Sequence, residues 1–273
     1  MYKLILSDLD ETLLVKHHVP DFNAKAIKEA RKQGVKFVPA TGRAFNMIPE
    51  ILQEIDAYQK ESEYSICFNG GLIVENKNGK ILHFEGLEYS MTQELFEIAK
   101  RYEVCVLIFT LDCCYIFNAD EDEVQRKTEQ KAPFKVIDEY NMEFLENDKI
   151  AKILFERRDM DYLMSIKNEL YPKYKDKVAM SFSSNRYLEF NALGVNKGKG
   201  LLWLSQYLNI PIEQCIAVGD NYNDLEMIKV AGLGACVASS NDDIKKASDV
   251  VLKKDYFEGA IQELIEEYVL EEA

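Results

Sequence analysis

The sequence predicts an α/β protein: a Rossmann-like, doubly wound parallel sheet core with an inserted α+β cap domain. Three observations support this fold class. Short apolar runs alternate with helical patterns at both ends of the 273-residue chain. In the middle of the chain this alternation gives way to patterns typical of antiparallel strand pairs. Polar residues directly follow several of the outer strands, as expected where strand ends line a crevice.

The first block of the chain reads as alternating strands and helices. The expected elements are a strand (3–7), a helix (22–33), a strand (35–39), a helix starting near Arg43, a strand (65–68) and a hairpin (72–75 with 80–84). Gly34 closes the first helix, and Asn78 and Gly79 form the hairpin turn. These elements form the first half of a parallel sheet with a small hairpin beside it.

The middle and last blocks differ in the order of their expected helices and strands. In the middle we expect a helix (91–102), strands (104–110, 113–118, 177–183 and 186–190), and a solvated helix start in the acidic stretch 120–123. In the last block we expect a helix (197–208), a strand (215–218), a helix (223–230), a strand (233–237) and a terminal helix with Phe257, Ile261, Leu264, Ile265 and Tyr268 on one face. The predicted domains are a core formed by residues 1–85 plus 187–273 and an inserted cap at 86–186.

Composition and charge exclude several functional classes. A content of 47% hydrophobic residues can fill a sizeable core. The formal net charge of -14 disfavours nucleic acids and anionic membrane surfaces as partners. We expect a cytoplasmic protein, because we find neither a signal-peptide pattern nor an apolar run long enough to span a membrane. The sequence leaves open whether the chain is a monomer or a small homo-oligomer.

The cysteines and histidines give no clear site. The six cysteines lie in apolar stretches without zinc-type spacing, so we expect them to be reduced and mostly buried. His17 and His18 lie in a polar loop and His83 ends a hairpin, and we assign no role to them.

Acidic residues follow two of the predicted core strands. Asp8 and Asp10 come after the first strand, and Asp220 and Asp224 come after the strand at 215–218. The carboxyl ends of parallel strands converge on one crevice, so these acids can meet although they are far apart in sequence. Their hard oxygen ligands suit Mg²⁺.

Groups that bind anions are expected at the same edge. Thr41, Gly42 and Arg43 follow the strand at 35–39, where a hydroxyl, a glycine amide and a predicted helix start together suit an anion. Lys197 begins another helix and adds a positive charge. Each motif alone could be an ordinary structural turn or a solvated charge, but four of them in order at strand ends favour a catalytic site.

These motifs resemble, in order, those of the haloacid dehalogenase-like hydrolases. They are Asp8-Leu9-Asp10-Glu11-Thr12-Leu13-Leu14, Thr41-Gly42-Arg43, Lys197 and Gly219-Asp220-Asn221-Tyr222-Asn223-Asp224. The large insertion between the second and third motifs resembles the type IIB cap of the Cof-type subfamily, which includes sugar phosphatases. One departure is Glu11, where many members carry glycine, so the turn after Asp10 must accept a side chain.

The resemblance implies a role for each matched residue. Asp8 would be the nucleophile that forms an aspartyl-phosphate, and Asp10 would act as general acid and base. The implied metal ligands for Mg²⁺ are Asp8, Asp220 and the backbone carbonyl of Asp10. The implied phosphate-binding groups are the Leu9 amide, Thr41, Gly42, Lys197 and Asn223. Asp224 would orient the metal or Lys197.

We therefore expect a Mg²⁺-dependent phosphatase for small phosphorylated metabolites, with sugar phosphates as the expected class. The inserted cap would close over the crevice to exclude water and select the leaving group. Two alternatives remain open. A phosphomutase would pass the same aspartyl-phosphate to a sugar hydroxyl, and a receiver-like phosphoacceptor switch would be phosphorylated without turnover, although receiver domains are about half as long and lack the insertion. The role of Arg43 is not decided by the sequence.

Overall fold

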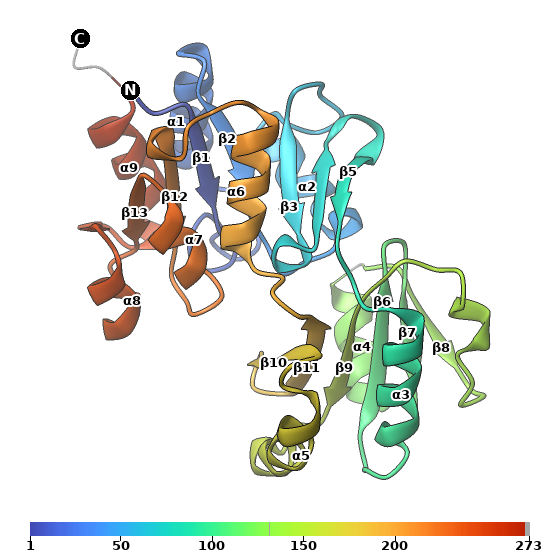
Figure 1. Cartoon of the computed structure of the whole chain (residues 1–273). Helices are drawn as coiled ribbons and strands as arrows, with labels where there is room; N and C mark the ends of the chain where they lie inside the picture. Colours follow the sequence, from blue (N-terminus) through green and yellow to red (C-terminus); the bar gives the residue numbers. More distant parts are fainter. Residues whose placement is uncertain (131, 271–273) are drawn as a thin grey trace. The chain divides into compact units, whose positions relative to one another are not determined.

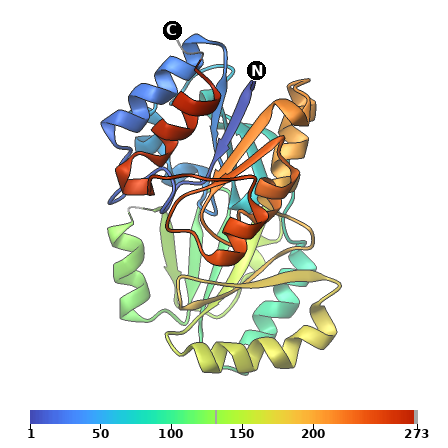
Figure 2. The same ribbon diagram turned by 90° about the vertical axis from the view of Figure 1, so that its left-hand side faces the viewer.

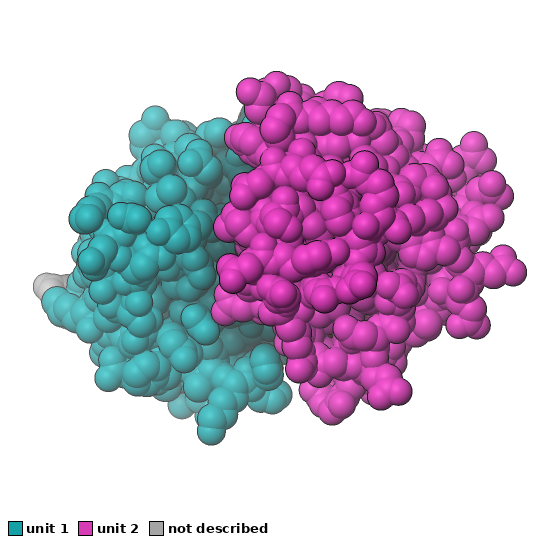
Figure 3. Space-filling view, turned by 90° about the horizontal axis from the view of Figure 1, so that it is seen from below, with its two compact units in different colours: residues 1–84, 196–273 teal, residues 85–195 magenta. Residues whose placement is uncertain are grey.

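The computed structural model describes residues 1–130 and 132–270. The chain divides into two compact units, coloured separately in Figure 3. Unit 1 contains Met1–Phe84 and the chain from Asn196 onward, and unit 2 contains Glu85–Val195. Unit 1 therefore comes from both ends of the sequence, and unit 2 is an insertion.

Unit 1 is built on a five-stranded sheet in which every paired strand is parallel. The strand order is β14 (Val250–Val251), β13 (Leu233–Cys236), β12 (Cys215–Gly219), β1 (Leu4–Ser7) and β2 (Lys36–Pro39). All four residues of β1 are buried, as expected for a strand covered on both faces. The strand β1 thus pairs with β2 from the first part of the chain and with β12 from its last part.

Helices cover both faces of this sheet, which is the doubly wound arrangement that the sequence predicts. On one face, α1 (Asp21–Lys32) and α9 (Ala260–Tyr268) pack side by side (Figure 2). On the other, Leu4 and Leu6 share an apolar cluster with side chains of α6 (Lys197–Tyr207) and α7 (Leu225–Val230) (Figure 1). The short α8 (Asp242–Ala247) lies between β13 and β14 in the chain. Leu4 and Leu6 face one helical layer because side chains alternate along a strand.

The terminal helix differs in one detail from the sequence prediction. Ile261, Leu264 and Ile265 are buried, but Phe257 is 52% exposed. Phe257 lies in a preceding 3-10 turn (Tyr256–Glu258), so it is out of phase with the apolar stripe of α9. Among the helices of the described residues, none has the length and apolar character needed to cross a membrane.

A small antiparallel sheet lies beside β2. It consists of β3 (Tyr64–Cys67), β4 (Leu72–Glu75) and β5 (Lys80–Phe84), with 3-10 turns at Phe68–Gly70 and Lys77–Gly79. A bridge between Ala40 and Ile66 connects it with the main sheet. The turn at Phe68–Gly70 therefore lies at the edge where β1 and β2 end.

The helix expected to start near Arg43 starts later in the structure. The chain after β2 bends, forms a 3-10 turn at Phe45–Met47, and begins α2 only at Pro49 (Pro49–Glu54). Ala44 has extended backbone angles, and proline is favoured in the first turn of a helix, so the helix starts later than predicted. Arg43 therefore stands in a loop, and no helix N-terminus contributes an anion site there.

Unit 2 contains a six-stranded sheet with its own apolar core. The order is β10 (Val178–Ser183), β11 (Tyr187–Ala192), β9 (Ile150–Glu156), β6 (Cys105–Thr110), β7 (Cys114–Phe117) and β8 (Phe134–Ile137). Its helices are α3 (Tyr89–Ala99), α4 (Glu121–Glu129) and α5 (Met160–Tyr174), with a 3-10 turn at Glu143–Leu145. All strand pairs except β7 with β8 are antiparallel, as an α+β insertion requires.

The second domain boundary also differs from the prediction. Residues 187–195 were assigned to the core, but β11 pairs with both β9 and β10, so these residues belong to unit 2. The last strand of the insertion, β11, is followed closely by α6 of unit 1, and apolar patterning alone does not assign a strand to a sheet.

The acidic stretch 120–123 is only partly solvated. Asp120 caps α4 by accepting from the Glu123 amide, as a helix start requires. Glu123 itself is fully buried, where the Tyr187 hydroxyl donates to it and Arg186 and Lys127 form ion pairs with it. The prediction that this stretch is solvated is therefore wrong at Glu123.

The cysteines follow the sequence expectation closely. All six are free thiols, and five of them are buried: Cys67, Cys105, Cys114, Cys215 and Cys236. Cys113 is partly exposed and directly precedes β7.

Candidate active site

The candidate site begins where β1 ends. The Asp8 amide donates to the Val218 carbonyl at 3.0 Å, so β1 and β12 remain paired up to the first acidic residue. Asp8 is only 6% exposed. The Ser7 hydroxyl donates to the Asp8 carbonyl at 2.8 Å, which fixes the backbone at the end of the strand.

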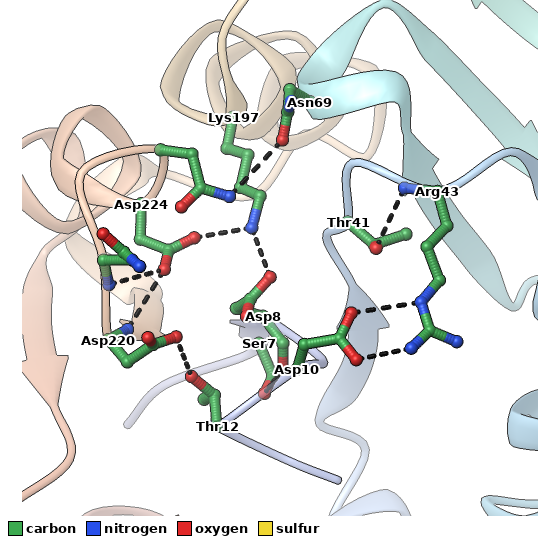
Figure 4. A network of polar contacts seen from close by, with 12 residues as sticks. Ser7, Asp8, Asp10, Thr12, Thr41, Arg43, Asn69, Lys197, Asp220 and Asp224 are labelled. Atoms are coloured by element: carbon green, nitrogen blue, oxygen red, sulfur yellow. Dashed lines mark hydrogen bonds and ion pairs between the residues drawn. The ribbon is translucent and has the colours of Figure 1, made fainter. Parts of the chain in front are cut away.

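Lys197 brings positive charge to Asp8 from a distant part of the chain. It is the first residue of α6, whose start is capped by the Asn196 side chain. Its side chain is fully buried, and its Nζ donates to Oδ1 of Asp8 and, at 2.5 Å, to Oδ1 of Asp224 (Figure 4). One ammonium group thus links the ends of two neighbouring strands.

The loop after β12 is wound around the Asp224 carboxylate. Its Oδ2 accepts from the backbone amides of Asp220 at 3.0 Å and Asn221 at 3.1 Å. A Cβ at Gly219 would lie 2.4 Å from the Asp224 Cγ, so only glycine allows this carboxylate to approach the strand end. Asp224 therefore orients both Lys197 and the loop that carries Asp220.

Asp220 completes a group of three carboxylates. Its Oδ1 accepts from the Thr12 hydroxyl at 3.0 Å. One oxygen from each of Asp8, Asp220 and Asp224 can be chosen so that all three lie within 4.8 Å of one another. The sequence expectation that these acids converge on one edge agrees with this arrangement.

Burial and mutual repulsion change the acidity of two of these groups. Burial, together with the negative charge of Asp224, raises the pKa of Asp8 to about 7. Burial and the charges of Asp8 and Asp224 raise the pKa of Asp220 to about 8. Burial lowers the pKa of Lys197, but the charges of Asp224 and Asp8 outweigh it and the net shift is upward, so this side chain stays charged. The one positive charge of Lys197 therefore does not balance the three carboxylates when they are ionised.

The same cluster fits a divalent cation. Three carboxylates and one ammonium group leave a net charge of two negative units, which one divalent cation would balance. Among the described side chains, none donates a hydrogen bond to Oδ2 of Asp8 or Oδ2 of Asp220, whereas both oxygens of Asp224 are engaged. One or two carboxylates with water are the usual protein ligands of Mg²⁺. Asp8 and Asp220 are thus the better ligands, with Asp224 as their support.

Asp10 points to the other side of the strand end. Its carboxylate lies against Arg43, whose Nε donates to Oδ2 at 3.1 Å and whose Nη2 pairs with Oδ1 (Figure 4). Residues two apart would share a face of an extended strand, but the chain has left β1 and bends at Leu9, so Asp8 and Asp10 face different partners. Glu11 follows with a φ of 59°, a left-handed conformation that explains why glycine is common at this position in the family.

The loop after β2 brings Thr41 and Gly42 to the same edge. The Thr41 hydroxyl accepts from the Arg43 amide at 3.1 Å, and Thr41 is 2% exposed. A Cβ at Gly42 would lie 3.3 Å from the Asn69 side chain, so the backbone is close to that amide. Leu9 is fully buried, and its carbonyl accepts from the amides of Leu13 and Leu14, which closes the turn after β1.

Asn69 is a residue that the sequence analysis missed. The Asn223 Nδ2 is 3.5 Å from the Asn69 Oδ1, so Asn69 connects the last motif with the turn at Phe68–Gly70. The signal available in the sequence is the run Asn69-Gly70-Gly71 directly after a strand, which by itself indicates only a turn. Thr12 and Arg43 likewise gain partners that spacing did not predict.

The fold and the site together define a class: a Rossmann-like α/β protein whose buried carboxylates and lysine gather at the carboxyl edge of a parallel sheet. The family model described as haloacid dehalogenase-like hydrolase matches residues 5–264. The chain therefore belongs to the haloacid dehalogenase-like hydrolases, and the resemblance seen in the motifs is confirmed.

Known relatives agree with this assignment. The chain is 28% identical to the 5-amino-6-(5-phospho-D-ribitylamino)uracil phosphatase YcsE of Bacillus subtilis, with 98% of this chain and 96% of that protein covered. The crystal structure of a haloacid dehalogenase-like hydrolase from Bacteroides thetaiotaomicron has a TM-score of 0.87 at 26% identity and covers 97% of this chain and 99% of its own. The sugar phosphatase BT4131, described as subclass IIB, shares the fold with a TM-score of 0.80 at 18% identity, over 97% and 98% of the two chains.

Proposed function

We propose that this hydrolase is a Mg²⁺-dependent phosphatase that cleaves small phosphate monoesters through an aspartyl-phosphate on Asp8. The observation that carries the proposal is the ion pair of the buried Lys197 with Asp8, inside a cluster of three carboxylates. Relatives named as phosphatases along nearly the whole chain support the same activity.

Electrostatics explains why such a cluster suits phosphoryl transfer. A carboxylate that approaches a phosphate dianion meets about two unit repulsions, each near 4 kcal/mol at 4 Å for an effective dielectric of 20. About 8 kcal/mol must therefore be offset. Lys197 supplies one positive charge, and Mg²⁺ held by Asp8, Asp220 and the Asp10 backbone carbonyl would supply the rest on the phosphoryl oxygens.

The residues of the chain would act in two half-reactions. In the first, a carboxylate oxygen of Asp8 forms a bond to phosphorus while the ester P–O bond breaks, and Asp10 donates its proton to the leaving oxygen. In the second, Asp10 takes a proton from a water molecule that attacks phosphorus, and the bond to Asp8 breaks. Orthophosphate leaves, and Asp8 and the proton on Asp10 are restored.

Neutral and positive groups would hold the transferred phosphoryl group. They are the Leu9 amide, Thr41, Gly42, Lys197 and Asn223. All five come from loops or helix starts of unit 1, where Thr41 and Lys197 are buried and fixed by hydrogen bonds. Sugar phosphates are the proposed substrates, in keeping with the description of BT4131 as a sugar phosphatase.

The test measures orthophosphate release from a panel of sugar phosphates and p-nitrophenyl phosphate, with Mg²⁺ and with a chelator. We expect release with Mg²⁺ only, and a phosphorylated protein in rapid-quench mass spectrometry. Asp8→Asn should abolish both, whereas Asp243→Asn, an exposed carboxylate in α8, should retain both. Full turnover by Asp8→Asn would refute the nucleophile, and isomerised sugar phosphate without free orthophosphate would indicate a mutase.

A further inference from the structure

Arg43 and Asp10 form a two-point contact at the rim of the site. Arg43 Nε donates to Asp10 Oδ2 at 3.1 Å, and Nη2 pairs with Oδ1, so the planar guanidinium faces the planar carboxylate. The Asp10 side chain is 54% exposed and that of Arg43 only 22%. The more exposed partner is the one to which the proposed function assigns proton transfer.

The backbone of Arg43 is held firmly. Its amide donates to the Thr41 hydroxyl at 3.1 Å, and its carbonyl accepts from the Phe68 amide at 3.1 Å. The next amide, that of Asn69, donates to the Thr41 carbonyl at 2.9 Å. The loop that carries Arg43 is thus tied to the turn at Phe68–Gly70 by hydrogen bonds on both of its sides.

That turn is itself in an uncommon conformation. Phe68 and Asn69 both have positive φ, at 49° and 55°, where side chains other than glycine are disfavoured. Two such residues in sequence persist only when the surrounding contacts require them. These two residues are the ones whose amides donate to the Arg43 and Thr41 carbonyls, so the unusual turn is in direct contact with the loop that carries Arg43.

The direction of Asp10 depends on this fixed arginine. Figure 4 shows the Asp10 carboxylate directed toward Arg43, while that of Asp8 is directed toward Lys197. An aspartate that is half exposed at the end of a strand can otherwise turn between several rotamers. With Arg43 present, one carboxylate oxygen can remain on Nε while the other exchanges Nη2 for a leaving-group oxygen or water.

We propose that Arg43 is the positioning residue for Asp10: its guanidinium group holds one oxygen of the Asp10 carboxyl group and thereby directs the other toward the leaving group. This inference rests on the proposed phosphatase function. Arg43 in this role does not touch the phosphoryl group, so its removal should affect the step that needs Asp10 more than the steps that do not. Arg43→Lys replaces the planar guanidinium with an ammonium group that can hold only one carboxylate oxygen. This variant should therefore retain part of the positioning of Asp10.

The experiment compares two classes of substrate by kcat/KM. An alkyl phosphate such as a sugar phosphate has a poor leaving group that needs a proton from Asp10, whereas p-nitrophenyl phosphate has a leaving group that departs unprotonated. Arg43→Gln should lower kcat/KM for the alkyl ester at least tenfold more than for the aryl ester. Asp10→Asn should show the same bias, and the double variant should be no worse than Asp10→Asn alone, because both changes remove one function.

Other outcomes would overturn the inference. Equal losses for both esters, additive with Asp10→Asn and accompanied by weaker inhibition by orthophosphate, would make Arg43 a ligand of the phosphoryl group. Unchanged kinetics with a lower melting temperature would make it structural only. Arg101→Gln removes an exposed arginine whose Nη2 lies 2.7 Å from Glu169, and it should leave the ratio of the two substrates unchanged. If the wild-type protein released no phosphate at all, the proposed function would fail instead, which this design separates from a failure of Arg43.

Discussion

Lys197 holds two carboxylates with one ammonium group: its Nζ donates to Oδ1 of Asp8 and to Oδ1 of Asp224. The three side chains are at most 9% exposed. Buried charges of this kind are stable only as a set, because removal of one member leaves the others unpaired in a medium that solvates them poorly. The pairing therefore links the stability of the site with its chemistry.

Replacement of this lysine should damage both properties. Lys197→Met is expected to lower kcat at least a hundredfold, because positive charge on the transferred group is lost. It should also lower the free energy of unfolding by about 3 kcal/mol at pH 8, since Asp8 and Asp224 then repel each other without a counter-charge. Steady-state kinetics and urea denaturation measure the two effects. Lys199→Met, two residues along the same helix and exposed, serves as control, and an active Lys197→Met would contradict the assigned role.

The raised pKa values of Asp8 and Asp220 predict a pH-dependent response to Mg²⁺. Both folded values, about 7 and about 8, exceed the ordinary 3.8, so the metal-free folded protein retains protons that the unfolded chain has already released. The metal-free protein should therefore lose stability as pH rises from about 4 to about 8. Mg²⁺ needs the ionised carboxylates, so its thermal stabilisation should be small at about pH 5.5 and large at about pH 8.5. An equal shift at both pH values would count against these two ligands.

Two glycines with positive φ allow a matched test of the turn that supports the site. A Cβ at Gly70 would lie 2.2 Å from the Asn196 carbonyl oxygen, whereas a Cβ at Gly34 would meet nothing within 4 Å. Gly34→Ala should cost about 1 kcal/mol, the backbone penalty alone. Gly70→Ala should cost clearly more and also reduce kcat, because Asn196 precedes Lys197 and must move. Urea denaturation and steady-state kinetics of both variants measure these effects. Equal losses of unfolding free energy would show that the backbone shifts to relieve the contact between position 70 and Asn196.

Unit 2 contains a buried carboxyl group with an unusual pH response. Glu156 is 1% exposed, and among the described residues neither of its oxygens has a hydrogen-bond partner. Burial, followed by the charge of Asp120, raises its pKa from 4.5 to about 7. The stability that the neutral form contributes is complete below about pH 4.5 and is lost as pH rises through about 7.

Glu156→Gln should remove this loss. The variant should match the wild type in unfolding free energy at about pH 4.5 and exceed it by up to about 3 kcal/mol at about pH 8. Urea denaturation at the two pH values measures the difference. Glu139→Gln, an exposed glutamate of the same unit, should show no such trend. A Glu156→Gln protein that is less stable than the wild type at about pH 8 would disprove the buried, unpartnered state.

The parallel core and the convergence of its acids could be predicted from the sequence for a simple physical reason. Strands such as Leu4–Ser7 are buried on both faces and therefore mostly apolar, and the residues that follow them must lie at one sheet edge. Asp8, Asp220 and Asp224 could be placed together on that argument alone, whereas Lys197, which begins a helix and follows no strand of this sheet, is placed there by the order of the motifs. Their closeness depends on topology rather than on the details of any loop.

The parts that escaped prediction depend on loop geometry and on pairing between distant side chains. The pair of Arg43 with Asp10 and the contact of Asn69 with Asn223 arise where loops from different strands meet, and neither spacing nor periodicity describes such contacts. The burial of Glu123 depends on Tyr187 and Arg186, more than sixty residues away. The strand at Tyr187–Ala192 has the same apolar pattern as a core strand, so only its pairing with β9 and β10 assigns it to unit 2.

The pairing of β1 with β12 has a consequence for protein synthesis. Asp8 is translated 189 residues before Lys197, so its partners Lys197, Asp220 and Asp224 emerge from the ribosome only after all of unit 2. A chain that stops short of residue 224 has no assembled carboxylate cluster. Chain termination before Asp224 should therefore give fragments that lack the proposed phosphatase activity.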